Sequence, residues 1–181
     1  PHAVPGEDVV LFTVGAMDSP ESYDQSDIDA VRPSNGERRT VMRGASMARY
    51  VPTGHLVFAR EGFLFAVPFD IKTLETSGAP VPVVEDVMGM RSSGVVHAGF
   101  ARNGLLAYIA GKPGAFTSKD HNFYPGETVE KQLIVINNSR ETVTCDCRWS
   151  FGLPERVVGA KAITVATGEQ QRIPLRFVVP E

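Results

Sequence analysis

The sequence lacks several features that mark common classes of protein. It has no run of lysine or arginine and its formal net charge is −3, so the basic surface that nucleic-acid binding requires is missing. Its longest apolar run, residues 63–69, contains a proline and is far shorter than the ~20 residues of a membrane-spanning helix. We therefore expect neither a nucleic-acid partner nor a membrane span. Residue 1 opens no leader pattern, so we expect that any signal peptide has been removed or never existed.

Long stretches with helical periodicity are also missing, and 13 prolines and 17 glycines separate short apolar runs. The clearest element covers residues 143–151, where valine, both cysteines, the only tryptophan and a phenylalanine alternate with polar residues. Successive side chains of a strand point to opposite faces, so this period of two predicts a strand with one dry face. Since 43% hydrophobic content is ample for a core, we predict an all-β protein of one large or two small domains.

The amino-terminal half contains turn signals between short strands. Asn35 and Gly36 separate two such strands and predict a hairpin, because both residues tolerate positive φ. The stretch 50–58, Tyr-Val-Pro-Thr-Gly-His-Leu-Val-Phe, matches 100–108, Phe-Ala-Arg-Asn-Gly-Leu-Leu-Ala-Tyr, at a spacing near that of a propeller blade. The recurrence of an aromatic residue, a turn that ends in glycine and an apolar strand predicts an internal repeat.

These motifs, with Leu-Phe-Ala-Val-Pro-Phe-Asp at 64–70 and Ala-Pro-Val-Pro-Val-Val-Glu at 79–85, resemble blades of TolB-like β-propellers, including those attached to bacterial serine/threonine kinases. The resemblance covers roughly residues 27–111 and implies about two propeller-like blades. Complete propellers close with ~4 to 8 blades. We therefore expect a partial propeller at residues 1–111, either a fragment or part of a ring completed by other copies, with exposed sheet edges that invite pairing.

A second block begins after the Gly-Lys-Pro-Gly boundary at 111–114 and spans residues 112–181. Its Asp-His-Asn-Phe-Tyr-Pro-Gly-Glu at 120–127 and Asn-Asn-Ser-Arg at 137–140, ahead of the strand with Trp149, resemble the immunoglobulin-like sandwich domains that accompany bacterial glycoside hydrolases. Such domains carry one more strand after the point where this chain stops. The resemblance therefore implies a truncated immunoglobulin-like β-sandwich, with an edge that the amino-terminal half or a second copy would fill.

Two incomplete pieces that resemble unrelated families favour a recombined or engineered chain, in which the parents' activities need not survive. A bacterial, extracytoplasmic origin is implied by the two resemblances alone.

Two groups of residues are candidate metal ligands by type. Five carboxylates crowd residues 18–29, which fits either a calcium loop or a solvated acidic loop, although the spacing and the missing central glycine depart from the common calcium motif. Cys145 and Cys147 form a single Cys-x-Cys without the second pair of a typical zinc site. Buried cysteine beside Trp149 is the simpler interpretation.

The histidines are the remaining candidates for chemistry. His97 and His121, with Asp120, flank the expected domain junction, and His55 is a further weak candidate for a zinc site that would activate water. No two of them are spaced as a strand or helix pair, so solvated or turn histidines remain the alternative. Ser46 lies in a partial match to a nucleophile elbow that lacks the second glycine.

Three functions are compatible with these features. The first is a non-catalytic β-rich binding or assembly module that forms homo-oligomers through unpaired sheet edges. The second is a small hydrolase, with or without zinc or calcium as its cofactor, whose site lies at the domain junction. The third is a carbohydrate-binding accessory module, which the resemblance to glycoside hydrolase domains implies.

Overall fold

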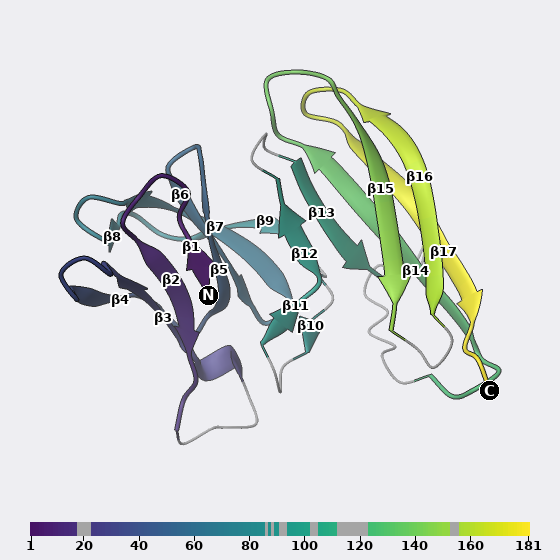
Figure 1. Ribbon diagram of the computed structural model, residues 1–181, viewed down its shortest axis with the longest axis horizontal. Helices are drawn as coiled ribbons and strands as arrows, with labels where there is room; N and C mark the ends of the chain where they lie inside the picture. The colour runs from purple at the N-terminus through teal and green to yellow at the C-terminus, as the bar shows by residue number, and fades with distance from the viewer. Residues whose placement is uncertain are drawn as a thin grey trace. The chain divides into compact units, whose positions relative to one another are not determined.

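The computed structural model of the chain describes residues 1–17, 23–85, 87, 89–90, 94–101, 105–111, 123–152 and 156–181 (Figure 1). It confirms the all-β prediction, because the described residues form several antiparallel sheets and one short 3₁₀ turn, η1 (Tyr23–Gln25). No helix in the described residues has the length and apolar character needed to cross a membrane.

Two compact units make up the chain, Pro1–His97 and Ala98–Glu181. The observed boundary thus lies earlier in the chain than the boundary expected at residues 111–112. The reason is that β13 (Leu105–Ala110) pairs with β14 (Thr128–Asn137) of the second block. The first unit contains β1 (His2–Ala3), β2 (Val10–Val14), β3 (Asp27–Val31), β4 (Arg38–Arg43), β5 (Ser46–Val51), β6 (His55–Arg60), β7 (Phe63–Asp70), β8 (Glu75–Thr76), β9 (Val81–Val84), β10 (Gly89–Met90) and β11 (Val95–Val96).

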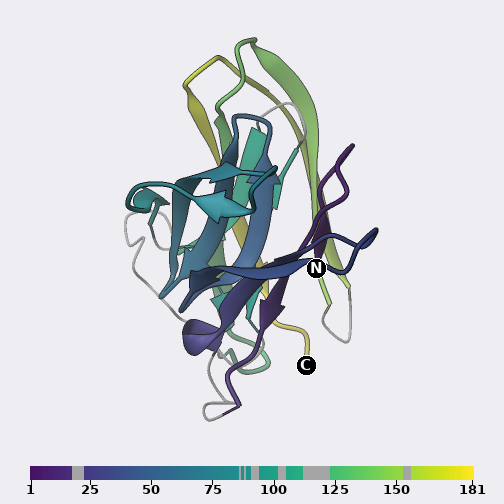
Figure 2. The same ribbon diagram turned by 90° about the vertical axis from the view of Figure 1, so that its left-hand side faces the viewer.

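The larger sheets of the first unit follow one another along the chain. The first has the order β1-β2-β3-β4, and in the second β5, β6 and β7 pair in sequence while β8 and β9 both pair with β7. The turn at Asn35 and Gly36 joins β3 to β4 as predicted, and Gly36 takes a φ of 74°. In Figure 2 the first sheet runs from purple to dark blue and the second from blue to teal.

Apolar side chains from both sheets form the core of the first unit. Leu11 and Ile28 on the first sheet and Leu56 and Phe58 on the second are fully buried, and β5 contacts β1, β2 and β3. The alternation of apolar and polar residues therefore places one face of each sheet against the other.

Arginine side chains link these two sheets around the core. Arg32, which follows β3, donates a hydrogen bond of 2.7 Å to the carbonyl of Lys72, and Arg60 on β6 donates to the carbonyls of Arg43 and Gly44, both at 2.7 Å. Hydrogen bonds from a charged donor are stronger than neutral ones, so they help to hold the sheets in place.

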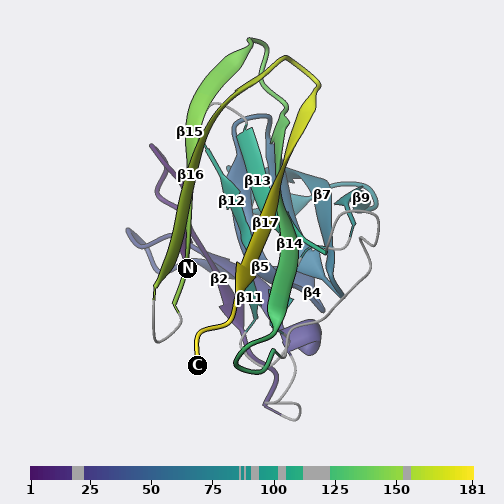
Figure 3. The ribbon, with the colours of Figure 1, turned by 90° about the vertical axis from the view of Figure 1, so that its right-hand side faces the viewer.

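The second unit consists of two layers. Its strands are β12 (Ala98–Phe100), β13 (Leu105–Ala110), β14 (Thr128–Asn137), β15 (Val143–Phe151), β16 (Val157–Val165) and β17 (Gln170–Val178). One sheet has the order β12-β13-β14-β17, and β15 and β16 form a separate ribbon of nine paired residues (Figure 3). Val135, Ile163 and Leu175 are among the residues buried between the layers.

Asn137 ties the two layers together at one end. Its side chain is fully buried, and Nδ2 donates to the carbonyls of Glu141 at 2.8 Å and Val165 at 2.9 Å. A buried amide needs such partners to offset its desolvation. The predicted Asn-Asn-Ser-Arg turn therefore also anchors the end of β16.

Candidate functional site

Of the candidate histidines, the structure describes His55 and His97, and neither lies within a group of metal ligands among the described residues. His97 lies between β11 and β12 and is exposed, while Nδ1 of His55 lies 3.0 Å from the carbonyl oxygen of Thr53 at the start of β6. Oγ1 of Thr53 lies 3.2 Å from the same nitrogen, so these contacts of the ring are local to the turn before β6. Asp120 and His121 lie outside the described residues. Within the described part of the chain, no three histidine, cysteine or acidic side chains come together as a metal site would require.

The acidic segment binds arginine where the structure describes its side chains. Oδ2 of Asp27 lies 3.2 Å from Nη1 of Arg43, and Oδ2 of the buried Asp29 lies 2.6 Å from Nε of Arg38. The acidic positions 18 and 21 of the calcium prediction lie outside the described residues. Asp27 and Asp29 thus act as cross-strand partners of β4, because an ion pair across neighbouring strands satisfies both charges.

The two cysteines point to the same face of β15, and both are free thiols. Their sulfur atoms are 4.0 Å apart, and both side chains are half-buried. Burial and the neighbouring Cys145 raise the pKa of the Cys147 thiol to about 11. Since the thiolate is the reactive form, this raised pKa lowers the reactivity of Cys147 at neutral pH.

Ser46 has no nucleophile-elbow geometry. It is the first residue of β5 and follows β4, so the segment joins two strands, whereas the elbow joins a strand to a helix. Met47 beside it has a positive φ of 54°, and the pairing of β5 with β6 shifts between Ser46 and Arg49. This segment is a β-bulge at the start of an edge strand.

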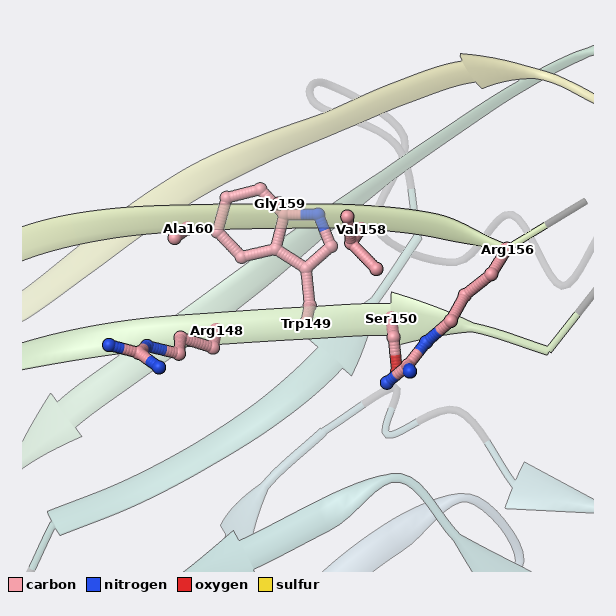
Figure 4. Close-up of a pocket in the computed structure, with 7 residues that line it drawn as sticks. All are labelled: Arg148, Trp149, Ser150, Arg156, Val158, Gly159 and Ala160. Atoms are coloured by element: carbon pink, nitrogen blue, oxygen red, sulfur yellow. The ribbon is translucent and has the colours of Figure 1, made fainter.

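An open pocket of about 450 Å³ lies on the β15–β16 ribbon. Figure 4 shows the indole of Trp149 reaching from β15 across to β16, and Arg156 extending toward Ser150. A Cβ atom placed on Gly159 would lie 2.3 Å from the indole, so only glycine leaves room for this ring. The lining residues are Arg148, Trp149, Ser150, Arg156, Val158, Gly159 and Ala160.

The lining of this pocket offers positive charge and hydrogen-bonding groups. Arg148 and Arg156 supply fixed positive charge and several donors, and Ser150 supplies a hydroxyl group. None of the lining residues is a histidine, cysteine, aspartate or glutamate, so the lining holds neither a general base nor an activated nucleophile. It offers positions for a polar or anionic group beside an aromatic ring.

Sequence reasoning missed the two arginines of this pocket. Arg148 is recognisable as a polar position of the alternating strand, but Arg156 lies just ahead of β16 and nothing in its own neighbourhood marks it. It comes to Ser150 only because β15 and β16 pair in one register, in which Ser150 lies opposite Val158.

Comparison of the chain with family models, with curated proteins and with solved structures finds no match in any of the three.

Proposed function

We propose that the chain is a non-catalytic, β-rich binding and assembly module. It would consist of two propeller-like blades joined to an immunoglobulin-like β-sandwich. Two consecutive antiparallel sheets with a shared core support the first part of this proposal. Two layers of strands around a second core support the other.

The observation that carries the proposal is the β15–β16 ribbon. Its strands pair with each other over nine residues each, and among the described residues neither strand has a partner on its outer edge. A long strand edge presents unpaired backbone donors and acceptors, which favours the addition of another strand. Self-association into a homo-oligomer would satisfy these groups.

The inner strands of the larger sheet in the second unit, β13 and β14, have a neighbour on both sides. β13, which the sequence placed in the amino-terminal half, pairs with β14 from Leu105 opposite Asn137 to Ala110 opposite Gln132. β12 and β13, which lie ahead of the expected boundary at residues 111–112, therefore belong to the larger sheet of the second unit. In the described part of the chain, both nine-residue strands of the ribbon have an outer edge without a further strand, as does the equally long β17.

Measurement of molar mass by light scattering across micromolar concentrations tests the assembly role. We expect a mass that rises above that of one chain as concentration increases, and no turnover of ester or phosphoester substrates with or without a chelator. A single-chain mass at every concentration would refute self-association. Turnover that a chelator abolishes would favour the metal-dependent hydrolase instead.

Carbohydrate binding is the second candidate, and the pocket on the ribbon favours it. Trp149 offers an aromatic ring, and Arg148 and Arg156 offer donors to hydroxyl or acidic groups of a saccharide. Affinity electrophoresis in gels that contain neutral or acidic polysaccharides would test it, with Arg156→Ala as the variant expected to lose retardation. Equal mobility in every gel would exclude this role.

A further inference from the structure

The outer edge of β15 is the least protected long edge in the described part of the second unit. Natural proteins blunt edge strands with proline, glycine kinks or inward-pointing charge. β17 carries Pro174, and β16 carries Gly159 and the exposed Lys161, which lies opposite the core-facing Cys147. β15 contains none of these residues. It has no proline, glycine or inward-pointing charge to discourage another strand, and the two charges that it does carry, Asp146 and Arg148, are opposite in sign.

The outward face of β15 carries two charges with no partner across the ribbon. Asp146 lies opposite Ala162 and Arg148 lies opposite Ala160, so the neighbouring strand offers each of them only a methyl group. Both side chains are exposed, and neither forms an ion pair within the described residues. The charges are two residues apart and opposite in sign.

We propose that β15 pairs antiparallel with β15 of a second copy of this chain, about a two-fold axis at Cys147. In that register Asp146 of each copy lies opposite Arg148 of the other, which gives two cross-strand ion pairs. Thr144 meets Ser150 on the same outward face. On the core face, Val143 meets Phe151 and Cys145 meets Trp149. Every residue thus meets one of compatible chemistry, because the strand is self-complementary about its centre.

This pairing rests on the assembly function proposed above and names the partner. It would join two ribbons into one four-stranded sheet with the order β16-β15-β15-β16. A two-fold contact of this kind is isologous and closes on itself. Since the remaining outer strand on each side carries Gly159 and Lys161, we expect growth to stop at the dimer.

Charge exchange at positions 146 and 148 tests the register. Asp146→Arg places like charges opposite each other twice in a homodimer, and so does Arg148→Asp. We expect each variant to raise the dissociation constant of the dimer by about tenfold or more.

The double variant Asp146→Arg/Arg148→Asp restores both pairs and should recover the dimer. An equimolar mixture of the two single variants should form a heterodimer, because all the charges then face opposite charges.

Lys161→Glu is the matched control, since it reverses an exposed charge on β16 and leaves β15 unchanged. It should not alter the dissociation constant. Fluorescence of Trp149 checks that every variant is folded, and light scattering with native mass spectrometry reads the assembly state. The pairing through β15 is wrong if the wild-type chain is a dimer that both single variants retain. It is also wrong if Lys161→Glu alone weakens the dimer. In either case the assembly function stands. If the wild-type chain is monomeric throughout, both are wrong.

Discussion

The two units differ in how completely their strands cover the core. In the first unit most core residues are buried, including Leu56 and Phe58 with no exposed surface. In the second, β15 contributes Cys145, Cys147, Trp149 and Phe151, all of which are only half-buried, while β16 contributes the buried Ile163 and Val165. Complete burial maximises the hydrophobic contribution to stability, whereas a partly covered layer leaves area that a further contact can bury. The first unit is thus closed by itself, and the second has surface to offer.

The strongest challenge to this comparison is to remove one phenylalanine from each core. The ring of Phe58 stacks on Phe65 with their centroids 5.7 Å apart, and the ring of Phe151 lies 4.5 Å from that of Phe177. We expect Phe58→Ala to lower the free energy of unfolding by about 3–5 kcal/mol, because it leaves a cavity in a closed core. Phe151→Ala should cost only about 1–3 kcal/mol.

Urea unfolding followed by far-UV circular dichroism measures both changes. Equal costs for the two variants would break the distinction between a closed and a partly covered core.

The contact between Trp149 and Gly159 is the exception to the open packing of the ribbon. A Cβ atom at Gly159 would overlap the indole, so Gly159→Ala must displace the ring at a cost of about 1–3 kcal/mol. Gly99→Ala in β12 is the matched control, since a Cβ atom there has no neighbour within 4 Å, and we expect a change within about 0.5 kcal/mol.

Trp149 is the only tryptophan, so its emission reports the displacement directly. An unchanged emission spectrum and unchanged stability in Gly159→Ala would show that the ring does not pack on β16.

Local patterns in the sequence were enough to predict individual strands. The alternation that predicted a strand at Val143–Phe151 corresponds to β15 over its full length, and the Asn-Gly turn joins β3 and β4. Both are local, since they depend on the pleat and on turn geometry. The pairing of β13 with β14 and the meeting of Arg156 with Ser150 depend on which distant strands pair and in which register. A single strand's own sequence does not carry that information, so the pocket emerged only from the structure.

The reactivity of Cys147 measures how well the ribbon packs on the sheet beneath it. Burial and Cys145 raise its pKa from 9.0 to about 11, which lowers the thiolate fraction near pH 8 by about a hundredfold. In Cys145→Ser, where Cys147 is the only thiol and burial is the main remaining cause of its raised pKa, we expect iodoacetamide to react faster in urea than in buffer, by less than that factor. Mass spectrometry of quenched samples gives both rates. Similar rates in the two solvents would mean that the ribbon separates from the sheet beneath it.

The smallest expected effect is a pH dependence confined to the first unit. Partial burial lowers the pKa of His97, and burial together with the charge of Arg49 lowers the pKa of His2. Both residues belong to the first unit. A histidine with a lowered pKa in the folded state binds fewer protons there than in the unfolded chain. Its contribution to stability is therefore complete above the unfolded value of 6.5 and is lost as the pH falls through the folded value.

Much of the His97 side chain remains exposed despite its partial burial, so solvent screens most of this effect. We expect His97 to contribute less than about 0.5 kcal/mol between pH 7.5 and 5.5. Urea unfolding at both pH values, for the wild-type chain and for His97→Gln, would measure it, with Trp149 fluorescence following the second unit separately. The first unit should lose stability on acidification, and less so in the variant. A pH dependence of equal size in the tryptophan signal would show that the two units unfold together. The closed and the open unit would then be parts of one cooperative structure.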